Sequence, residues 1–321
     1  MFFATSLLVI GLILLVYGAD RLVYSAAVIG RSLGIAPWLI GCTIVAFGTS
    51  LPELLVAVTA ALNHQIDMTV GNILGSNIIN ILLIVGGAAL IRPMAFHSDI
   101  VRRELPLLLL ATALCGLVLA DRALSRLDGM ILLLAAIGYI ATMVVISRRA
   151  LSEGTDSLTR EQLAELPQDT QDSSNTVAVL WLALAFIIMP ISAHMVIDNA
   201  GVVARHLGVG DLVIGLTAVA LGTSLPELAT VIAGALKGEN DIALGNLIGS
   251  NIVNSVMVLA VPALLSPGPF SPLAFTRDYW VMLAASVILT AFCLGKRRRI
   301  NSAMGALLLC GFAAYVTVLF I

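Results

Sequence analysis

Charged residues are scarce in this chain. Lysine, arginine, aspartate and glutamate together make up 11% of its 321 residues, whereas 60% are hydrophobic. A soluble protein of this length covers its surface with polar side chains, so this composition excludes an ordinary soluble domain. The net charge of -2 provides no basic field that would attract nucleic acid. The composition therefore indicates a protein that is covered by membrane lipid.

Several functional motifs are also missing. The cysteines lie in apolar runs without C-x-x-C spacing, which excludes the usual zinc and redox motifs. The sequence contains no HExxH pattern, and we predict that the protein is not an enzyme. We also predict no cofactor and no obligate protein partner. The apolar start lacks the basic residues of a secretory signal, and we interpret it as a retained first helix.

Long apolar runs dominate what is present. A transmembrane helix needs about 20 mostly apolar residues. The sequence predicts an all-α membrane protein with ten such helices, at about 2–29, 37–62, 68–90, 104–120, 127–146, 177–203, 212–236, 242–265, 279–294 and 303–321. Ten spans place both termini on the same side of the membrane.

The basic residues predict which side that is. With these spans, twelve of the 17 lysines and arginines face one side and four face the other, while Arg21 lies inside the first span. Loops rich in lysine and arginine remain in the cytoplasm. Both termini are therefore predicted to lie outside the cytoplasm.

The chain repeats itself at an offset of 174 residues. Segments 41–55 and 215–229 share eleven of fifteen residues, and segments 71–80 and 245–254 share seven of ten. With five spans in each half, the second half must enter the membrane from the opposite side, as in many secondary transporters. We predict two inverted five-helix repeats, residues 1–147 and 176–321, joined by a polar cytoplasmic linker, residues 148–175.

Two acidic residues lie within the predicted spans. Glu53 is in the middle of the second span, and Glu227 occupies the matching position of the seventh. An ionised carboxylate in the bilayer interior is costly unless it is paired, and neither span contains a lysine or arginine. A protonated glutamate is the alternative for a single copy. Two matched copies favour a transported cation as the missing positive charge.

A proline precedes each of these glutamates. Pro52 and Pro226 each remove a backbone donor and clash with the carbonyl four residues back, so each Gly-Thr-Ser-Leu-Pro segment is predicted to break its helix. A break frees carbonyl oxygens, which a membrane tolerates beside protein or a water-filled cavity. Carbonyls, hydroxyls and a carboxylate are hard oxygen ligands that suit calcium and sodium.

The third and eighth spans add further polar residues. Ser76 and Asn80 are four residues apart and share a helix face, as do Ser250 and Asn254, so we predict that they line the site. A second group of asparagines fits either secondary ligands or hydrogen bonds between helices. This second group consists of Asn72, Asn77, Asn246 and Asn251.

The paired Gly-Thr-Ser-Leu-Pro-Glu and Gly-Asn-x-x-Gly-Ser-Asn-Ile-x-Asn segments resemble the two α-repeats of the calcium/cation antiporter superfamily. Over essentially the whole chain, the sequence is similar to its bacterial inner-membrane calcium/sodium antiporters. The resemblance implies the sodium/calcium exchanger fold, with both termini in the periplasm. Several relatives, including potassium-dependent exchangers, carry aspartate at the position of Asn254, so asparagine there argues against potassium dependence.

The resemblance also implies the roles of individual residues. Glu53 and Glu227 would be the carboxylates that calcium and sodium share. The other implied ligands are the carbonyls of Thr49, Thr223, Ala46 and Ala220 and the hydroxyls of Ser50, Ser224, Ser76 and Ser250, with Asn80 and Asn254 beside the middle position.

These roles predict a secondary active antiporter that exchanges calcium for sodium across the inner membrane by alternating access. Calcium and sodium are its substrates, and its predicted partners are membrane lipid and small inorganic cations, not nucleic acid. A proton-coupled calcium exchanger and a cation channel are the alternatives.

Overall fold

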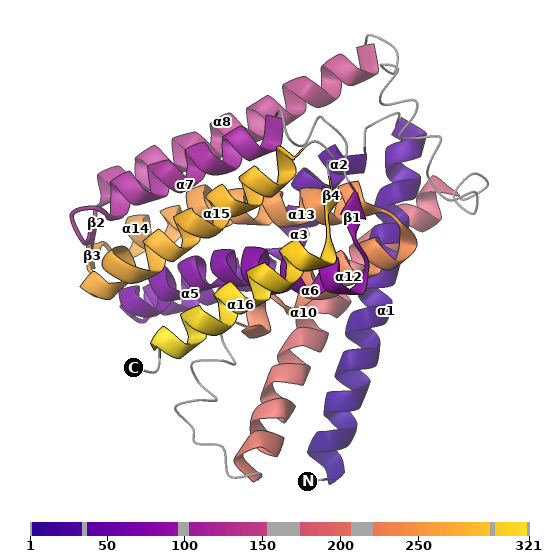
Figure 1. Ribbon diagram of the computed structural model, residues 1–321, viewed down its shortest axis with the longest axis horizontal. Coiled ribbons are helices and arrows are strands. Elements are labelled where there is room, and N and C mark those ends of the chain that lie inside the picture. The colour runs from indigo at the N-terminus through magenta and orange to yellow at the C-terminus, as the bar shows by residue number, and fades with distance from the viewer. Residues whose placement is uncertain are drawn as a thin grey trace.

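The chain folds into a bundle of helices (Figure 1). The structure is a computed structural model that describes residues 2–33, 37–95, 103–152, 174–206, 221–295 and 299–319. Its α-helices are α1 (Phe2–Leu33), α2 (Pro37–Ile40), α3 (Ala46–Thr49), α4 (Leu51–Leu62), α5 (Ile66–Ile78), α6 (Gly86–Ile91), α7 (Leu105–Leu119), α8 (Arg126–Ser152), α10 (Asn175–His206), α12 (Leu225–Lys237), α13 (Asn240–Val253), α14 (Ala260–Leu265), α15 (Trp280–Cys293) and α16 (Ser302–Leu319). Its π-helical segments are η1 (Gly41–Val45), η2 (Ile79–Val85), η5 (Asn254–Val258) and η6 (Ala274–Tyr279).

Several helices are long and apolar enough to cross a membrane. Within the described ranges, six continuous helical segments qualify by length and composition, and a bent pair raises this to seven. The six are Phe2–Gly30, Ile66–Ile91, Arg126–Ile146, Asn175–Val196, Asn240–Leu265 and Ser302–Leu319. Helix α7 is apolar but shorter.

The bent pair contains the predicted helix break. Segments Gly41–Thr49 and Leu51–Leu62 meet at an angle of 47°. Ser50, between them, leaves the helical conformation with φ -83 and ψ 5, and Ser224 has nearly the same angles, φ -87 and ψ 4. In both cases the chain resumes as a helix with proline in its first turn, where no intrahelical donor is needed. The break is therefore present in both copies of the motif.

The helix bounds recur at the offset of the sequence repeat. Adding 174 to the bounds of α6 (Gly86–Ile91) gives those of α14 (Ala260–Leu265), and α4 and α12 begin at equivalent leucines. The π-helical segments η2 and η5 also overlap at this offset. The sequence analysis did not predict them, because a π-turn depends on one inserted residue and leaves no separate hydrophobic pattern.

Two short strand pairs correct the all-α prediction. Strand β1 (Met94–Ala95) pairs antiparallel with β4 (Arg299–Ile300), and β2 (Ala123–Leu124) pairs antiparallel with β3 (Gly268–Pro269). Each pair joins a loop of the first half to a loop of the second. Strands of two residues are too short for an alternating pattern to reveal them in a sequence.

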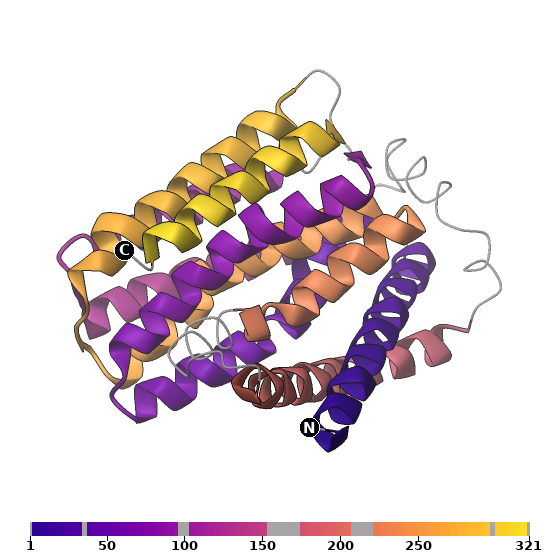
Figure 2. The same ribbon diagram turned by 60° about the horizontal axis from the view of Figure 1, so that its bottom comes forward.

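Helices α1 and α10 form a separate pair. They lie side by side and run across the direction of the other helices (Figures 1 and 2). Their buried side chains belong to one hydrophobic cluster, and the larger cluster lies in the rest of the bundle. Gly18 permits the close approach, because a Cβ there would lie 2.8 Å from Met189 Cγ. The amine of Lys237 lies 2.9 Å from the Asp20 carboxylate and so connects α1 to α12.

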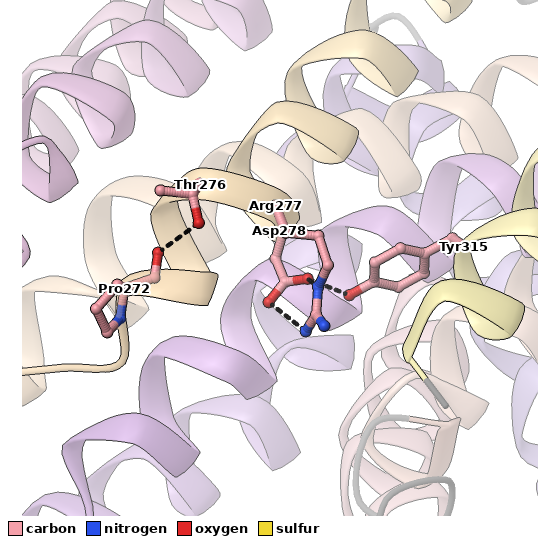
Figure 3. Close-up of polar contacts among 5 residues, drawn as sticks. All are labelled: Pro272, Thr276, Arg277, Asp278 and Tyr315. Atoms are coloured by element: carbon pink, nitrogen blue, oxygen red, sulfur yellow. Dashed lines mark hydrogen bonds and ion pairs between the residues drawn. The ribbon is translucent and has the colours of Figure 1, made fainter. Parts of the chain in front are cut away.

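A polar cluster connects η6 to α16 (Figure 3). The Arg277 side chain lies 2.7 Å from Asp278 Oδ1, and the Tyr315 hydroxyl donates to the same oxygen at 3.1 Å. The Arg277 guanidinium therefore balances the negative charge of the Asp278 carboxylate. The cluster lies directly before α15 (Trp280–Cys293) and connects the beginning of that helix to α16.

Candidate cation site

Glu53 and Glu227 lie in equivalent structural environments. Each is in the first turn of a helix that resumes after a break, α4 for Glu53 and α12 for Glu227, and each is 0% exposed. The positive end of a helix dipole stabilises a carboxylate at this position. None of the ion pairs found among the described residues involves either glutamate.

Hydroxyl groups from both halves surround the carboxylates. Ser50 Oγ lies 3.4 Å and Ser250 Oγ 3.5 Å from Glu227 Oε1. The hydroxyls of Thr223 and Ser224 lie near Glu53, although within the described structure neither Glu53 oxygen makes a hydrogen bond of ordinary geometry. These long contacts leave the buried carboxylates short of donors, which favours a bound cation.

The threonines of the repeated motif make matching contacts. Thr49 Oγ1 lies 3.0 Å from Asn246 Oδ1 and 3.3 Å from Ser250 Oγ. In the other copy, Thr223 Oγ1 lies 3.4 Å from the Asn72 side-chain oxygen and 3.3 Å from Ser76 Oγ. Thr49 thus contacts α13 and Thr223 contacts α5, in each case through an asparagine and a serine at equivalent positions of the repeat.

Two asparagine oxygens complete the polar core. Asn80 Oδ1 and Asn254 Oδ1 are buried and have no hydrogen-bond partner in the described parts of the chain. Both residues lie in π-helical segments, η2 and η5. Amide oxygens are hard ligands of the kind that calcium and sodium accept.

Contacts across the two halves join several of the predicted site residues, namely Ser50 with Glu227, Thr49 with Ser250, and Ser76 with Thr223. Predicted ligand Ala220 lies outside the described residues. Ala46 is buried, and its carbonyl accepts from the Ser50 backbone N–H at 3.1 Å and from the Ser250 hydroxyl at 3.4 Å. The threonines make their contacts through side-chain hydroxyls, whereas the prediction named their carbonyls.

The donor set consists of oxygen atoms. In the described ranges, no group of three His, Cys, Asp or Glu side chains is placed to hold a metal ion. Any cation held here would therefore be coordinated by two carboxylates together with neutral hydroxyl, carbonyl and amide oxygens. Such a mixture suits calcium and sodium better than transition metals, which prefer nitrogen and sulfur.

A cavity of about 670 Å³ lies beside the site. Thr223 and Gly222 line its inner end, while exposed residues such as Gln65, His194 and Asp198 line its outer part. This cavity could not be predicted from the sequence, because it lies between α4 and α10, whose packing no local pattern specifies.

Comparisons with known proteins identify relatives over the whole chain. Residues 3–145 and 177–321 match the family described as sodium/calcium exchanger protein. The chain is 53% identical to Inner membrane protein YrbG of Escherichia coli strain K12, covering 100% of this chain and 98% of that protein. It is 31% identical to Sodium/calcium exchanger MaX1 of Methanosarcina acetivorans, over 98% of this chain and 97% of that protein.

A solved structure shows the same fold. The sodium-calcium exchanger NCX_Mj, in crystals soaked with sodium and calcium, superposes with a TM-score of 0.81 at 29% sequence identity. The match covers 98% of both chains. The family match spans nearly all of this sequence, and the fold agrees with it. The chain belongs to the sodium/calcium exchanger protein family.

Proposed function

We propose that this protein is a secondary active antiporter that exchanges calcium for sodium across the bacterial inner membrane by alternating access. The observation that carries the proposal is the pair of fully buried glutamates, Glu53 and Glu227, one from each half and without a basic partner among the described ion pairs. Two such charges need a cation to balance them. The names of MaX1 and NCX_Mj support sodium and calcium as the cations, and the name of YrbG supports the inner membrane.

The proposed architecture has ten transmembrane helices in two inverted repeats, residues 1–147 and 176–321, with a cytoplasmic linker at 148–175 and both termini in the periplasm. The recurrence of helix bounds at the offset of 174 supports this division. The 12-to-4 distribution of basic residues supports the orientation.

The proposed ligands of calcium and sodium are the residues of the sequence prediction. The carboxylates would be shared, so calcium and sodium would exclude one another. A core with bound cations is nearly neutral and can switch between sides, whereas two bare carboxylates resist crossing a dry barrier. The proposed ligands are Glu53, Glu227, Thr49, Thr223, Ser50, Ser224, Ala46, Ala220, Ser76, Ser250, Asn80 and Asn254.

The test is calcium uptake by proteoliposomes that contain the purified protein. We expect an outward sodium gradient to drive uptake of radioactive calcium. We expect Glu53→Gln and Glu227→Gln each to reduce that uptake at least about tenfold, because each removes a buried charge worth several kcal/mol to a bound cation. Asp128→Asn is the matched control, since Asp128 accepts from Ser125 on an exposed surface.

The same vesicles separate the alternatives. Uptake driven by a pH gradient, and unaffected by sodium, would establish proton coupling instead. Uptake without any countertransported ion would indicate a channel. Sodium-driven uptake that survives both glutamate substitutions would contradict the proposed site.

A further inference from the structure

Asn77 and Asn251 are not among the proposed ligands, yet they bridge the two halves beside the site. They occupy equivalent positions on α5 and α13, 174 residues apart, and each is 1% exposed. The Asn77 amide donates to the Asn251 backbone carbonyl at 3.3 Å, and the Asn251 amide donates to the Asn77 carbonyl at 3.4 Å. The two side chains thus form a reciprocal pair across the interface between the helices.

Each member of this pair also holds a proposed ligand of the opposite half. Asn80 Nδ2 donates to Asn251 Oδ1 at 2.9 Å, and Asn254 Nδ2 donates to Asn77 Oδ1 at 3.3 Å. The amide group is planar, with nitrogen and oxygen on opposite sides, so a bond to the nitrogen also fixes the direction of the oxygen. In both ligands the oxygen that remains is buried and has no partner among the residues the structure describes.

We propose that Asn77 and Asn251 are positioning residues, which orient the amides of Asn254 and Asn80 so that oxygen faces the transported cation. An amide turned over would present two N–H donors, which repel a cation. The orienting bond crosses from one half to the other in both cases, so each half sets a ligand of its partner. This inference rests on the proposed function and adds two residues that act through the ligands.

A carboxylate provides the means to test this role. Aspartate in place of Asn80 or Asn254 presents an oxygen in either orientation and has no N–H group to misdirect. A positioning residue is therefore dispensable beside aspartate. A residue that only packs the helices together is needed equally beside either side chain.

The experiment measures the half-saturating calcium concentration and the maximal rate of the full-length protein in proteoliposomes. We expect Asn251→Ala to raise the half-saturating concentration about fivefold, because one hydrogen bond of about 1 kcal/mol no longer fixes the ligand. We expect no further rise when Asn251→Ala is added to Asn80→Asp. Asn63→Ala is the control, because the Asn63 amide donates to its own helix on the surface, to Thr59 O.

Asn77→Ala with and without Asn254→Asp repeats the test in the other half. An equal rise of the half-saturating calcium concentration in the asparagine and aspartate backgrounds would overturn the proposal in favour of a packing role. Loss of folding in both alanine variants, measured by gel filtration in detergent, would overturn it in the same way. If the wild-type protein transports calcium and the alanine variants have an unchanged half-saturating concentration, the positioning role alone is rejected. If the wild-type protein shows no calcium flux, the proposed function is rejected.

Discussion

The hydroxyl of Ser50 lies 3.4 Å from a carboxylate oxygen of Glu227, although 177 residues separate them in the sequence. Ser50 is the turn residue between α3 and α4, and Glu227 is in the first turn of α12. The helix break of one half therefore brings a donor to the acid of the other half. Neither half contains a complete site without its partner.

This contact predicts the effect of Ser50→Ala. Removing the hydroxyl takes away one of the few donors near a buried carboxylate, and a hydrogen bond to a charged group contributes about 1.5–3 kcal/mol. Because the contact is long, we expect the lower end of that range, about a tenfold rise in the half-saturating sodium and calcium concentrations. Transport assays in proteoliposomes measure both.

Ser6→Ala is the matched control, since Ser6 donates to the Phe2 carbonyl on an exposed surface of α1. We expect it to leave transport unchanged. A Ser50→Ala protein with wild-type concentration dependence for both ions would show that the hydroxyl does not support the site.

A second prediction concerns the interface between η1 and α13. A Cβ added at Gly249 would lie 2.5 Å from the Cys42 carbonyl oxygen and 2.7 Å from its Cα, so backbone must move to accommodate alanine. We expect Gly249→Ala to lower the free energy of unfolding by about 1–3 kcal/mol. The melting temperature of the purified protein in detergent measures this change.

Gly138 provides the comparison. It lies in α8, and its added Cβ would have nothing within 4 Å. Alanine favours a helix over glycine by about 0.5–1 kcal/mol, so Gly138→Ala should keep or raise the melting temperature. Equal melting temperatures for the two variants would contradict the close approach at Gly249.

Gly71 and Gly249 show why a sequence motif alone does not predict which glycine lies at a close helix contact. Gly71 is the first glycine of one copy of the Gly-Asn-x-x-Gly segment and Gly249 is the second glycine of the other copy, and small residues of this kind often permit close helix contact. In the structure, a Cβ at Gly71 has nothing within 4 Å, while one at Gly249 would collide with backbone. The motif is local, but the contact depends on which helix lies opposite.

The site also contains features that the sequence predicts and features that it does not. Glu53, its proline and its break were predictable, because a buried charge and a missing donor have local causes. The hydrogen bond between Asn251 and Asn80 was not predictable, because the two residues come from opposite halves and the bond depends on helix register. The π-helical segments and the short strand pairs were missed for the corresponding reason, since no hydrophobic period specifies them.

The cavity beside α4 predicts accessibility from one side of the membrane. Gln65 is an exposed residue of its lining, and the proposed orientation has this end of α4 outside the cytoplasm. In a protein whose native cysteines are replaced by serine, we expect Gln65→Cys to react with a membrane-impermeant thiol reagent added to the periplasmic side. We expect calcium transport to fall as labelling proceeds, because the adduct fills the cavity that leads to Thr223.

Leu294→Cys is the control for sidedness. Leu294 is exposed at the end of α15 that the predicted topology places in the cytoplasm. It should react in inverted vesicles and remain unlabelled in spheroplasts. Labelling of Gln65→Cys only in inverted vesicles would reverse the proposed orientation.

The ion pair between Asp20 and Lys237 predicts an effect on stability without an effect on the site. Lys237 is ten residues beyond Glu227 on α12, which corresponds to about 15 Å along the helix, and its amine lies 2.9 Å from Asp20 on α1. Both side chains are partly exposed, at 28% and 35%, so the pair contributes about 0–1 kcal/mol. We expect Lys237→Met to lower the melting temperature slightly and to leave the half-saturating calcium concentration unchanged.

A double-mutant cycle with Asp20→Asn isolates the pair from other contacts of the two residues. Asp20 also lies 3.2 Å from Arg21, so its single substitution loses more than the contact with Lys237. If the ion pair connects α1 to α12, the combined variant should lose less stability than the sum of the two single variants. Strictly additive losses would mean that the two charges do not interact, and α1 would then be held chiefly by its apolar contacts with α10.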